Sequence, residues 1–143
     1  MKAFFKHQGY RSVKLYKAKS RHLFCNVSIN KVKGVFIVDT GASDSCIDAS
    51  KKEHFLIESK GAVFEASGAG KDKLDAVMAE DCQFKIGRHR MYNQRFILLD
   101  MQHINTAFET LGVAPVDGIL GADFLFELSA VIDYYDLELF LAP

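Results

Sequence analysis

The stretch that decides the fold is Val35-Phe36-Ile37-Val38-Asp39-Thr40-Gly41-Ala42-Ser43. It opens with a continuous apolar run containing β-branched side chains, which is typical of a strand buried on both faces. Residues 22–29 place apolar side chains on one face, and the polar pair Asn30-Lys31 separates them from this run. The two segments therefore predict a β-hairpin whose second strand delivers a carboxylate, Asp39, into a turn of small residues.

Most of the remaining chain also has the pattern of strands, with one late exception. Residues 123–128 carry apolar side chains at helical spacing and predict one short helix. We expect one helical turn within residues 48–58 and a long irregular connection, with one helical turn at most, at residues 101–116. The prediction is an all-β chain with one short C-terminal helix. Further strands are predicted at residues 12–16, 62–66, 74–86, 95–100, 119–120, 131–134 and 138–141.

Length and composition favour a single globular domain. The chain has 143 residues, of which 49% are hydrophobic and 25% charged, and these are ordinary values for a packed core. It contains two prolines and no Pro-rich segment that would divide it. We therefore predict one domain over residues 1–143, with about residues 1–9 as a loose N-terminal arm.

The charge is unevenly placed although the net charge is zero. Residues 1–38 contain 9 of the 18 basic residues and none of the 18 acidic ones. This asymmetry is compatible with a basic arm that binds nucleic acid, or with an N-terminal hairpin that packs against a more acidic body. The basic residues alternate with apolar ones as in strands, so we favour the hairpin and do not expect nucleic acid as a partner.

Other classes of site lack support in the sequence. The three cysteines, Cys25, Cys46 and Cys82, are odd in number and form no Cys-x-x-Cys, and the five histidines lack ligand spacing. We therefore expect no disulfide framework, no metal and no cofactor. The sequence has no apolar stretch of about 18 residues and does not begin with the apolar run of a signal peptide. We expect a cytoplasmic protein without a membrane segment.

Two ordered motifs carry a family resemblance. Asp39-Thr40-Gly41 ends an apolar strand, and Ile119-Leu120-Gly121-Ala122-Asp123-Phe124-Leu125 follows at a predicted strand-to-helix junction. With the Gly-rich turn between them, they resemble the retropepsin-like (retroviral-type) aspartic proteases over about residues 12–141. The resemblance implies a closed acid-protease barrel and an aspartic endopeptidase. Because the chain has a single Asp-Thr-Gly, it resembles the half-size, homodimeric form that cleaves peptide or protein substrates.

The resemblance also implies roles for single residues. Asp39 would be the catalytic carboxylate, and Asp123 is expected to start or cap the helix without a catalytic role. A plain turn is nearly as good an interpretation of the Gly-rich hairpin as a substrate flap. The implied active-site loop is Thr40, Gly41, Ala42 and Ser43, the structural motif before the helix is Ile119, Leu120 and Gly121, and the implied substrate contacts are Asp44, Ser67, Gly68, Ala69 and Gly70.

The chemistry of peptide hydrolysis supports a dimer independently of the resemblance. Two facing carboxylates share one proton, because two like charges so close together cannot both ionise cheaply. One carboxylate then activates water while the other donates to the scissile carbonyl. A single Asp39 can supply both roles only if a second copy contributes its own Asp39. The alternative is a catalytically silent retropepsin-fold binding or assembly module.

Three positions depart from relatives of this type. Many retroviral enzymes have an Asp–Arg pair that braces the dimer where Ser43 and Ala122 stand here, so the dimer must be held elsewhere. We expect residues 138–141 to contribute an inter-subunit strand. Pepsin-like sites have a hydroxyl residue where Ala42 stands, and its absence predicts a working range nearer mildly acidic to neutral pH.

Overall fold

The computed structural model describes residues 1–58, 63–67 and 73–143, with the backbone alone for residues 63–67 and 73–75. Strands dominate, as expected. The helices are α1 (Lys2–His7), η1 (Ala49–Lys51, a 3₁₀ turn), α2 (Gln102–Thr110) and α3 (Ala122–Glu127). The strands are β1 (Arg11–Lys14), β2 (Tyr16–Lys17), β3 (Leu23–Ile29), β4 (Val32–Val38), β5 (Cys46–Asp48), β6 (Val63–Ser67), β7 (Lys73–Ile86), β8 (His89–Leu99), β9 (Gly118–Leu120), β10 (Val131–Asp133) and β11 (Glu138–Leu141).

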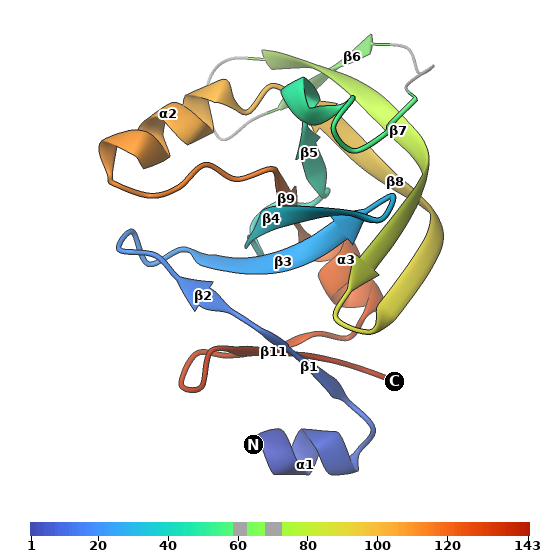
Figure 1. Cartoon of the computed structure of the whole chain (residues 1–143), viewed down its shortest axis with the longest axis vertical. Coiled ribbons are helices and arrows are strands. Elements are labelled where there is room, and N and C mark those ends of the chain that lie inside the picture. Colours follow the sequence, from blue (N-terminus) through green and yellow to red (C-terminus); the bar gives the residue numbers. More distant parts are fainter. Residues whose placement is uncertain (59–62, 68–72) are drawn as a thin grey trace.

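The main sheet closes into a barrel. Its strands follow the order β3-β4-β9-β5-β8-β7, and β7 pairs back onto β3 through Val27↔Ile86 to Ile29↔Phe84. The short strands β2 and β6 extend this sheet at its two ends. The long β7–β8 hairpin curves along one side of the molecule (Figure 1). The chain was predicted to be all-β with a closed barrel; the barrel is confirmed, and the chain is mostly β.

Two central strands place the ends of the two sequence motifs side by side. β4 and β9 run parallel in the register Phe36↔Gly118, Ile37↔Ile119 and Val38↔Leu120. Parallel strands end at the same edge of a sheet, so the chain leaves β4 and β9 at neighbouring points. A Cβ on Gly118 would meet the Phe36 ring at 2.5 Å, so this close pairing requires glycine in β9. The site is built at this shared edge.

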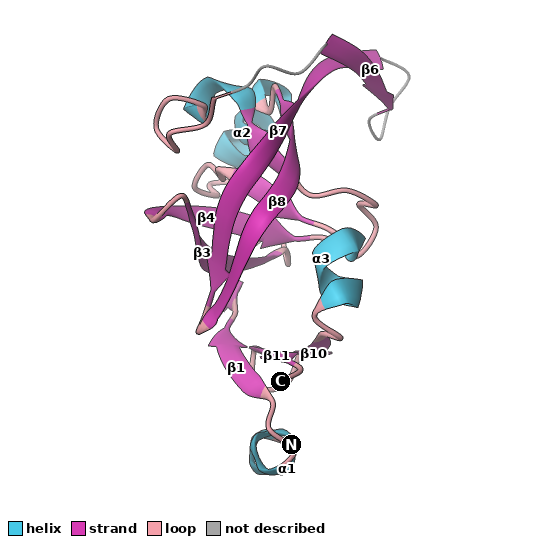
Figure 2. Cartoon of the chain, turned by 90° about the vertical axis from the view of Figure 1, so that its right-hand side faces the viewer, coloured by secondary structure: helices cyan, strands magenta, loops and turns pink. Residues whose placement is uncertain are grey.

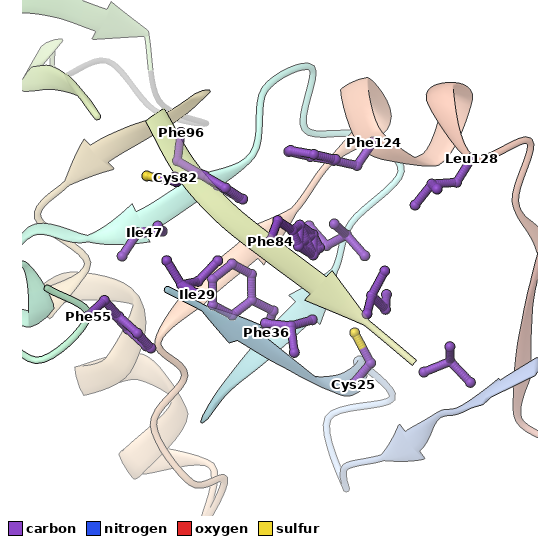
Figure 3. Packing of buried hydrophobic residues seen from close by; sticks show 14 of the residues in the cluster. Cys25, Ile29, Phe36, Ile47, Phe55, Cys82, Phe84, Phe96, Phe124 and Leu128 are labelled. Carbon is purple, nitrogen blue, oxygen red and sulfur yellow. The ribbon is translucent and has the colours of Figure 1, made fainter. Parts of the chain in front are cut away.

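Aromatic packing attaches the late helix to the barrel. The ring of Phe124, on α3, stacks on Phe96 at 5.1 Å between centroids and meets Phe84 edge-on at 4.8 Å. Figure 3 shows these rings with Phe36 in the barrel interior. Burying each such side chain stabilises the fold by about 1.5–3 kcal/mol. The predicted helix at residues 123–128 is confirmed, one residue earlier.

A second, three-stranded sheet holds the C-terminal strand. Its order is β1-β11-β10, with β11 pairing with β1 from Arg11↔Leu141 and with β10 from Val131↔Phe140. Both edges of β11 are therefore occupied within one chain. The expectation that residues 138–141 pair with a partner subunit is wrong, because an inter-subunit strand needs a free edge.

Two helices were not predicted. α2 lies where an irregular connection was expected, and its one buried residue, Phe108, packs against Phe24 at 6.0 Å. Residues 1–9, predicted as a loose arm, contain α1. The Phe5 ring of α1 stacks on Phe140 at 4.7 Å, while the rest of this helix is exposed. Each helix is anchored mainly through one aromatic residue, Phe5 in α1 and Phe108 in α2, which leaves only a weak periodic pattern.

Candidate active site

The Asp39 loop folds back on its own carboxylate. The Asp39 N–H donates to Leu120 O at 3.0 Å, which fixes the loop to the end of β9. The Gly41 N–H donates to Asp39 Oδ1 at 2.9 Å, and the Ala42 N–H donates to Asp39 O at 3.2 Å. A Cβ on Gly41 would lie 3.3 Å from Asp39 Oδ1, so glycine leaves room for this turn. The carboxylate of Asp39 is thereby held in one orientation.

The residues of this loop are nevertheless open to solvent. Asp39, Thr40 and Gly41 are all exposed, although the backbone that carries them is tied to the barrel. A carboxylate that is oriented by the backbone but uncovered by its own chain is suited to face something outside the chain. The Gly41 N–H bond to Oδ1 is the local bond that a turn Asp also makes, and it leaves Oδ2 without a hydrogen bond from the described residues.

The second motif lies directly against the loop. The Ala122 N–H donates to Ala42 O at 2.7 Å, and the Asp123 N–H donates to Ser43 O at 3.2 Å. A Cβ on Gly121 would lie 2.7 Å from Ala42 O, too close for any side chain. The two sequence motifs therefore meet backbone to backbone, and Gly121 is required by that approach.

A buried hydroxyl joins the two motifs through side chains. Ser45 is 1% exposed, and its Oγ donates to Asp123 Oδ1 at 2.6 Å while accepting from the Gly121 N–H at 2.8 Å. The Ser45 N–H donates to Asp123 Oδ2 at 3.0 Å, and the Phe124 N–H donates to Asp123 Oδ1 at 2.8 Å. Asp123 lies in the first turn of α3, not at its N-cap, which is Gly121. The sequence did not point to Ser45 as a site residue. In the sequence, Ser45 is only a small polar residue before a short apolar segment, and such residues are common.

The other predicted site residues lie in several places. Ile119 and Leu120 belong to β9, and Leu120 is fully buried in the core. Asp44 is exposed, and its Oδ2 accepts from Ser43 Oγ at 3.2 Å. Ser67 is the last residue of β6, which forms a projecting hairpin with β7 through pairs from Val63↔Val77 to Ser67↔Lys73 (Figure 2). The expected flap residues Gly68, Ala69 and Gly70 lie outside the described residues.

Metal ligation and membrane insertion receive no support from the described parts of the chain. In residues 1–58, 63–67 and 73–143, the described side chains include no group of three or more His, Cys, Asp or Glu that could hold a metal ion. In those same segments, no helix has the length and apolar character needed to cross a bilayer.

Burial raises the pKa of the Cys25 thiol to about 12, so this side chain is a core residue and not a nucleophile.

Comparison with known proteins decides the family. A family model described as "Aspartyl protease" matches residues 25–124, which include Asp39-Thr40-Gly41 and the second motif as far as Phe124. The chain belongs to the aspartyl protease family. No match to this aspartyl protease was found among curated proteins.

Solved structures show which aspartyl protease fold it has. A retropepsin-like aspartic protease from Rickettsia conorii matches with a TM-score of 0.61 and 19% identity, over 93% of this chain and 92% of that chain. EIAV protease, complexed with the inhibitor HBY-793, matches with a TM-score of 0.55 and 20% identity, over 82% of this chain and 97% of that chain. The retroviral protease-like domain of Ddi1 from Leishmania major matches with a TM-score of 0.56 and 16% identity, over 85% of this chain and 94% of that chain. At these identities the likeness concerns the fold, and the predicted retropepsin-like barrel is confirmed.

Proposed function

We propose that this aspartyl protease is an endopeptidase that works as a homodimer, in which Asp39 from each copy forms one catalytic dyad. The observation that carries the proposal is the Asp39 loop itself. Hydrogen bonds from Gly41 and to Leu120 orient the loop, yet Asp39 remains exposed on the isolated chain. Such a carboxylate is prepared to meet a partner across an interface.

The carboxylates beside Asp39 in the same chain have other roles. Both oxygens of Asp123 accept hydrogen bonds from Ser45, so this residue braces the loop. Asp44 is turned toward Ser43, whose hydroxyl donates to it at 3.2 Å. A second carboxylate facing Asp39 is therefore best supplied by a second copy, and a two-fold axis through the loop brings the two Asp39 side chains together.

The dyad would act through one shared proton. The ionised Asp39 accepts a proton from a water held between the two carboxylates, and that water attacks the carbonyl carbon of the scissile peptide bond. The protonated Asp39 donates its proton to the carbonyl oxygen, which gives a tetrahedral diol. Breakdown of the diol transfers a proton to the leaving nitrogen and restores the dyad.

The dimer needs a surface other than β11. β10 and β1 are the two edge strands of this sheet, and Figure 2 shows β10 on the same side of the molecule as α3. α3 in turn begins at the Asp39 loop, through the Ala122 N–H bond to Ala42 O. Phe126 on α3 is 84% exposed, which is unusual for so large an apolar side chain. We propose that α3 and the free edge of β10 meet their counterparts across the two-fold axis.

The first experiment measures cleavage of an unstructured protein such as casein across about pH 3 to 8, because the acid and base of a dyad limit the rate on opposite sides of its optimum. Asp39→Asn should lower the rate at least about a hundredfold. Glu53→Gln, which neutralises an exposed carboxylate outside the loop, is the control and should retain the wild-type rate. A folded dimeric wild type that cleaves nothing and does not bind a statine peptide would contradict the proposal and favour the silent binding module.

A subunit-mixing experiment tests the dyad itself. Wild type and Asp39→Asn are mixed in equal amounts and allowed to exchange subunits. If catalysis needs Asp39 from both copies, only about one quarter of the random dimers are active. If each subunit works alone, about one half of the activity remains. The second outcome would refute the shared dyad without refuting proteolysis.

Sedimentation of a surface variant tests the dimer face. Phe126→Asp should shift the protein toward monomer and lower its specific activity in parallel, because it places a charge in the proposed interface. Leu111→Asp is the matched control, since Leu111 is also exposed, at 54%, and follows α2, away from α3 (Figure 1). A Phe126→Asp protein that sediments like the wild type would contradict this choice of surface.

A further inference from the structure

Two adjoining hollows form one groove on the outer face of the barrel. The larger, of about 610 Å³, lies between β2–β3 and residues 112–116, and the smaller, of about 400 Å³, continues over β4 and the end of β7. Asn26 and Val35 line both hollows, so the two are continuous. In Figure 1 the segment between α2 and β9 runs alongside β3. We call this continuous surface the basic groove.

The basic groove is separate from the Asp39 loop. Side chains alternate along a strand, so Val35 and Ile37 lie on the same side of β4, and the Asp39 loop follows its last residue, Val38. Val35 lies in the groove, whereas Ile37 is buried in a cluster with Phe108 of α2. The contact between α2 and the sheet therefore stands between the groove and the catalytic loop.

The floor of the groove is apolar and partly uncovered. Val113 and Val116 form one wall and Phe24 the base, and all three are buried in the cluster beneath α2. Tyr16 is 46% exposed and Val35 is 38% exposed at the groove surface. These two neighbouring apolar side chains would lose water contact if a ligand covered them.

The charges around this floor are basic. Lys17 and Lys19 line the larger hollow, and Lys33 and Lys85 line the smaller one. Among the described side chains, none of these four lysines takes part in an ion pair. The one acidic lining residue, Asp117, is already engaged.

Asp117 is paired with Lys51, which does not line the groove, and with none of the four lining lysines. Its Oδ2 accepts from the Val35 N–H at 2.9 Å, and its Oδ1 lies 4.0 Å from Lys51 Nζ. A further positive charge lies at the rim, where Lys14 Nζ sits 5.2 Å from the centre of the Tyr16 ring. The groove thus combines an apolar floor with several lysines available to a ligand.

We propose that the basic groove binds an acidic, extended polypeptide segment that carries an apolar side chain. The apolar side chain would rest on Phe24 and Val35, and the flanking carboxylates would face Lys17 and Lys19. A narrow hollow walled by aliphatic residues suits a peptide side chain, whereas single-stranded nucleic acid favours exposed aromatic platforms and arginines. Such a surface would let this protein hold a partner at a distance from its catalytic loop, whether or not that partner is cleaved.

The test is a direct binding measurement on the whole chain with Asp39→Asn, so that the ligand stays intact. The probe is a fluorescein-labelled peptide of about ten Glu and Asp residues interrupted by two Leu, and these twelve residues in extended form span about 40–43 Å. Its anisotropy should rise on binding, and the rise should weaken with salt. Replacing Glu and Asp by Gln and Asn, or both Leu by Ser, should weaken binding.

Charge reversal locates the binding. Lys17→Glu with Lys19→Glu should raise the Kd about tenfold, since two surface attractions become repulsions. Lys6→Glu with Arg95→Glu makes the same charge change at two exposed positions outside the groove and should leave the Kd within about twofold. Circular dichroism confirms that each variant is folded. An equal loss in both double variants, no binding of the acidic peptide, or tighter binding of an RNA oligonucleotide of the same length would overturn the proposal.

Discussion

Ser45→Ala removes the single hydroxyl that joins the two motifs of the site. In the wild type, Ser45 Oγ donates to Asp123 Oδ1 at 2.6 Å and accepts from the buried Gly121 N–H at 2.8 Å. Loss of a hydrogen bond to a charged group costs about 1.5–3 kcal/mol, and a buried N–H left without a partner costs about 1–3 kcal/mol. The two losses share one side chain and are not fully additive, so we expect the free energy of unfolding to fall by about 3 kcal/mol.

This loss is large enough to measure by two methods. For a chain of this length the entropy of unfolding is about 0.3 kcal/mol/K, so the melting temperature should fall by about 10 °C. Urea titration should show a lower midpoint with an unchanged slope, because the surface exposed on unfolding stays the same.

A second serine, Ser50, supplies the control for Ser45→Ala. Ser50→Ala makes the same chemical change at an exposed position in η1 and should alter the free energy of unfolding by less than about 0.5 kcal/mol. If Ser45→Ala and Ser50→Ala proved equally mild, the buried hydroxyl would not be what holds the loop to α3, and the reasoning would fail.

Three further predictions concern other positions. Gly34→Ala should cost about 1–3 kcal/mol in urea unfolding, because its Cβ would lie 2.8 Å from the buried Phe55 ring; an unchanged midpoint would show that the ring can yield. Ala42→Ser should move the acid limb of the pH–rate profile to lower pH, since a hydroxyl donating to Asp39 favours its charged form; an unmoved limb counts against that bond. Burial raises the pKa of the Cys25 thiol from 9.0 to about 12, so above pH 9 the unfolded chain releases this proton more readily than the folded one. Stability from this thiol should be constant below pH 9 and fall by up to about 1.4 kcal/mol per pH unit between pH 9 and 12. Urea unfolding near neutral pH and at about pH 10 should show a shallower decline for Cys25→Ala than for wild type, and equal declines would refute the attribution.

Local patterns predicted the strands around the site well. The apolar run before Asp39 became β4, and the alternating segment before it became β3, paired with β4 from Leu23↔Val38 to Ile29↔Val32. The helical spacing at residues 123–128 became α3. These predictions succeeded because each element buries one continuous face, which leaves a period of two or of about 3.6 in the sequence.

The errors fall where a single long-range contact decides the structure. α2 buries little more than Phe108, so its apolar face was too narrow to distinguish it from an irregular segment. β5 was missed because it has only three residues, all of them buried, and so few positions show no period. The position of β11 between β1 and β10 also gave no local signal, since an apolar strand looks the same whether its edges pair within the chain or with a partner.

The sequence by itself determined single strands, from the period of burial along each element, and the family resemblance, from two short ordered motifs. The resemblance in turn implied the barrel and Asp39 as the candidate catalytic residue. Only the tertiary structure decided what surrounds Asp39. It showed that Ser45 and Asp123, which are 78 positions apart in the sequence, brace the loop. It also placed lysines from β2, β4 and β7 around one groove. The physical reason is that periodicity records whether a side chain is buried, whereas hydrogen-bond partners and shared surfaces depend on which distant elements the packing brings together.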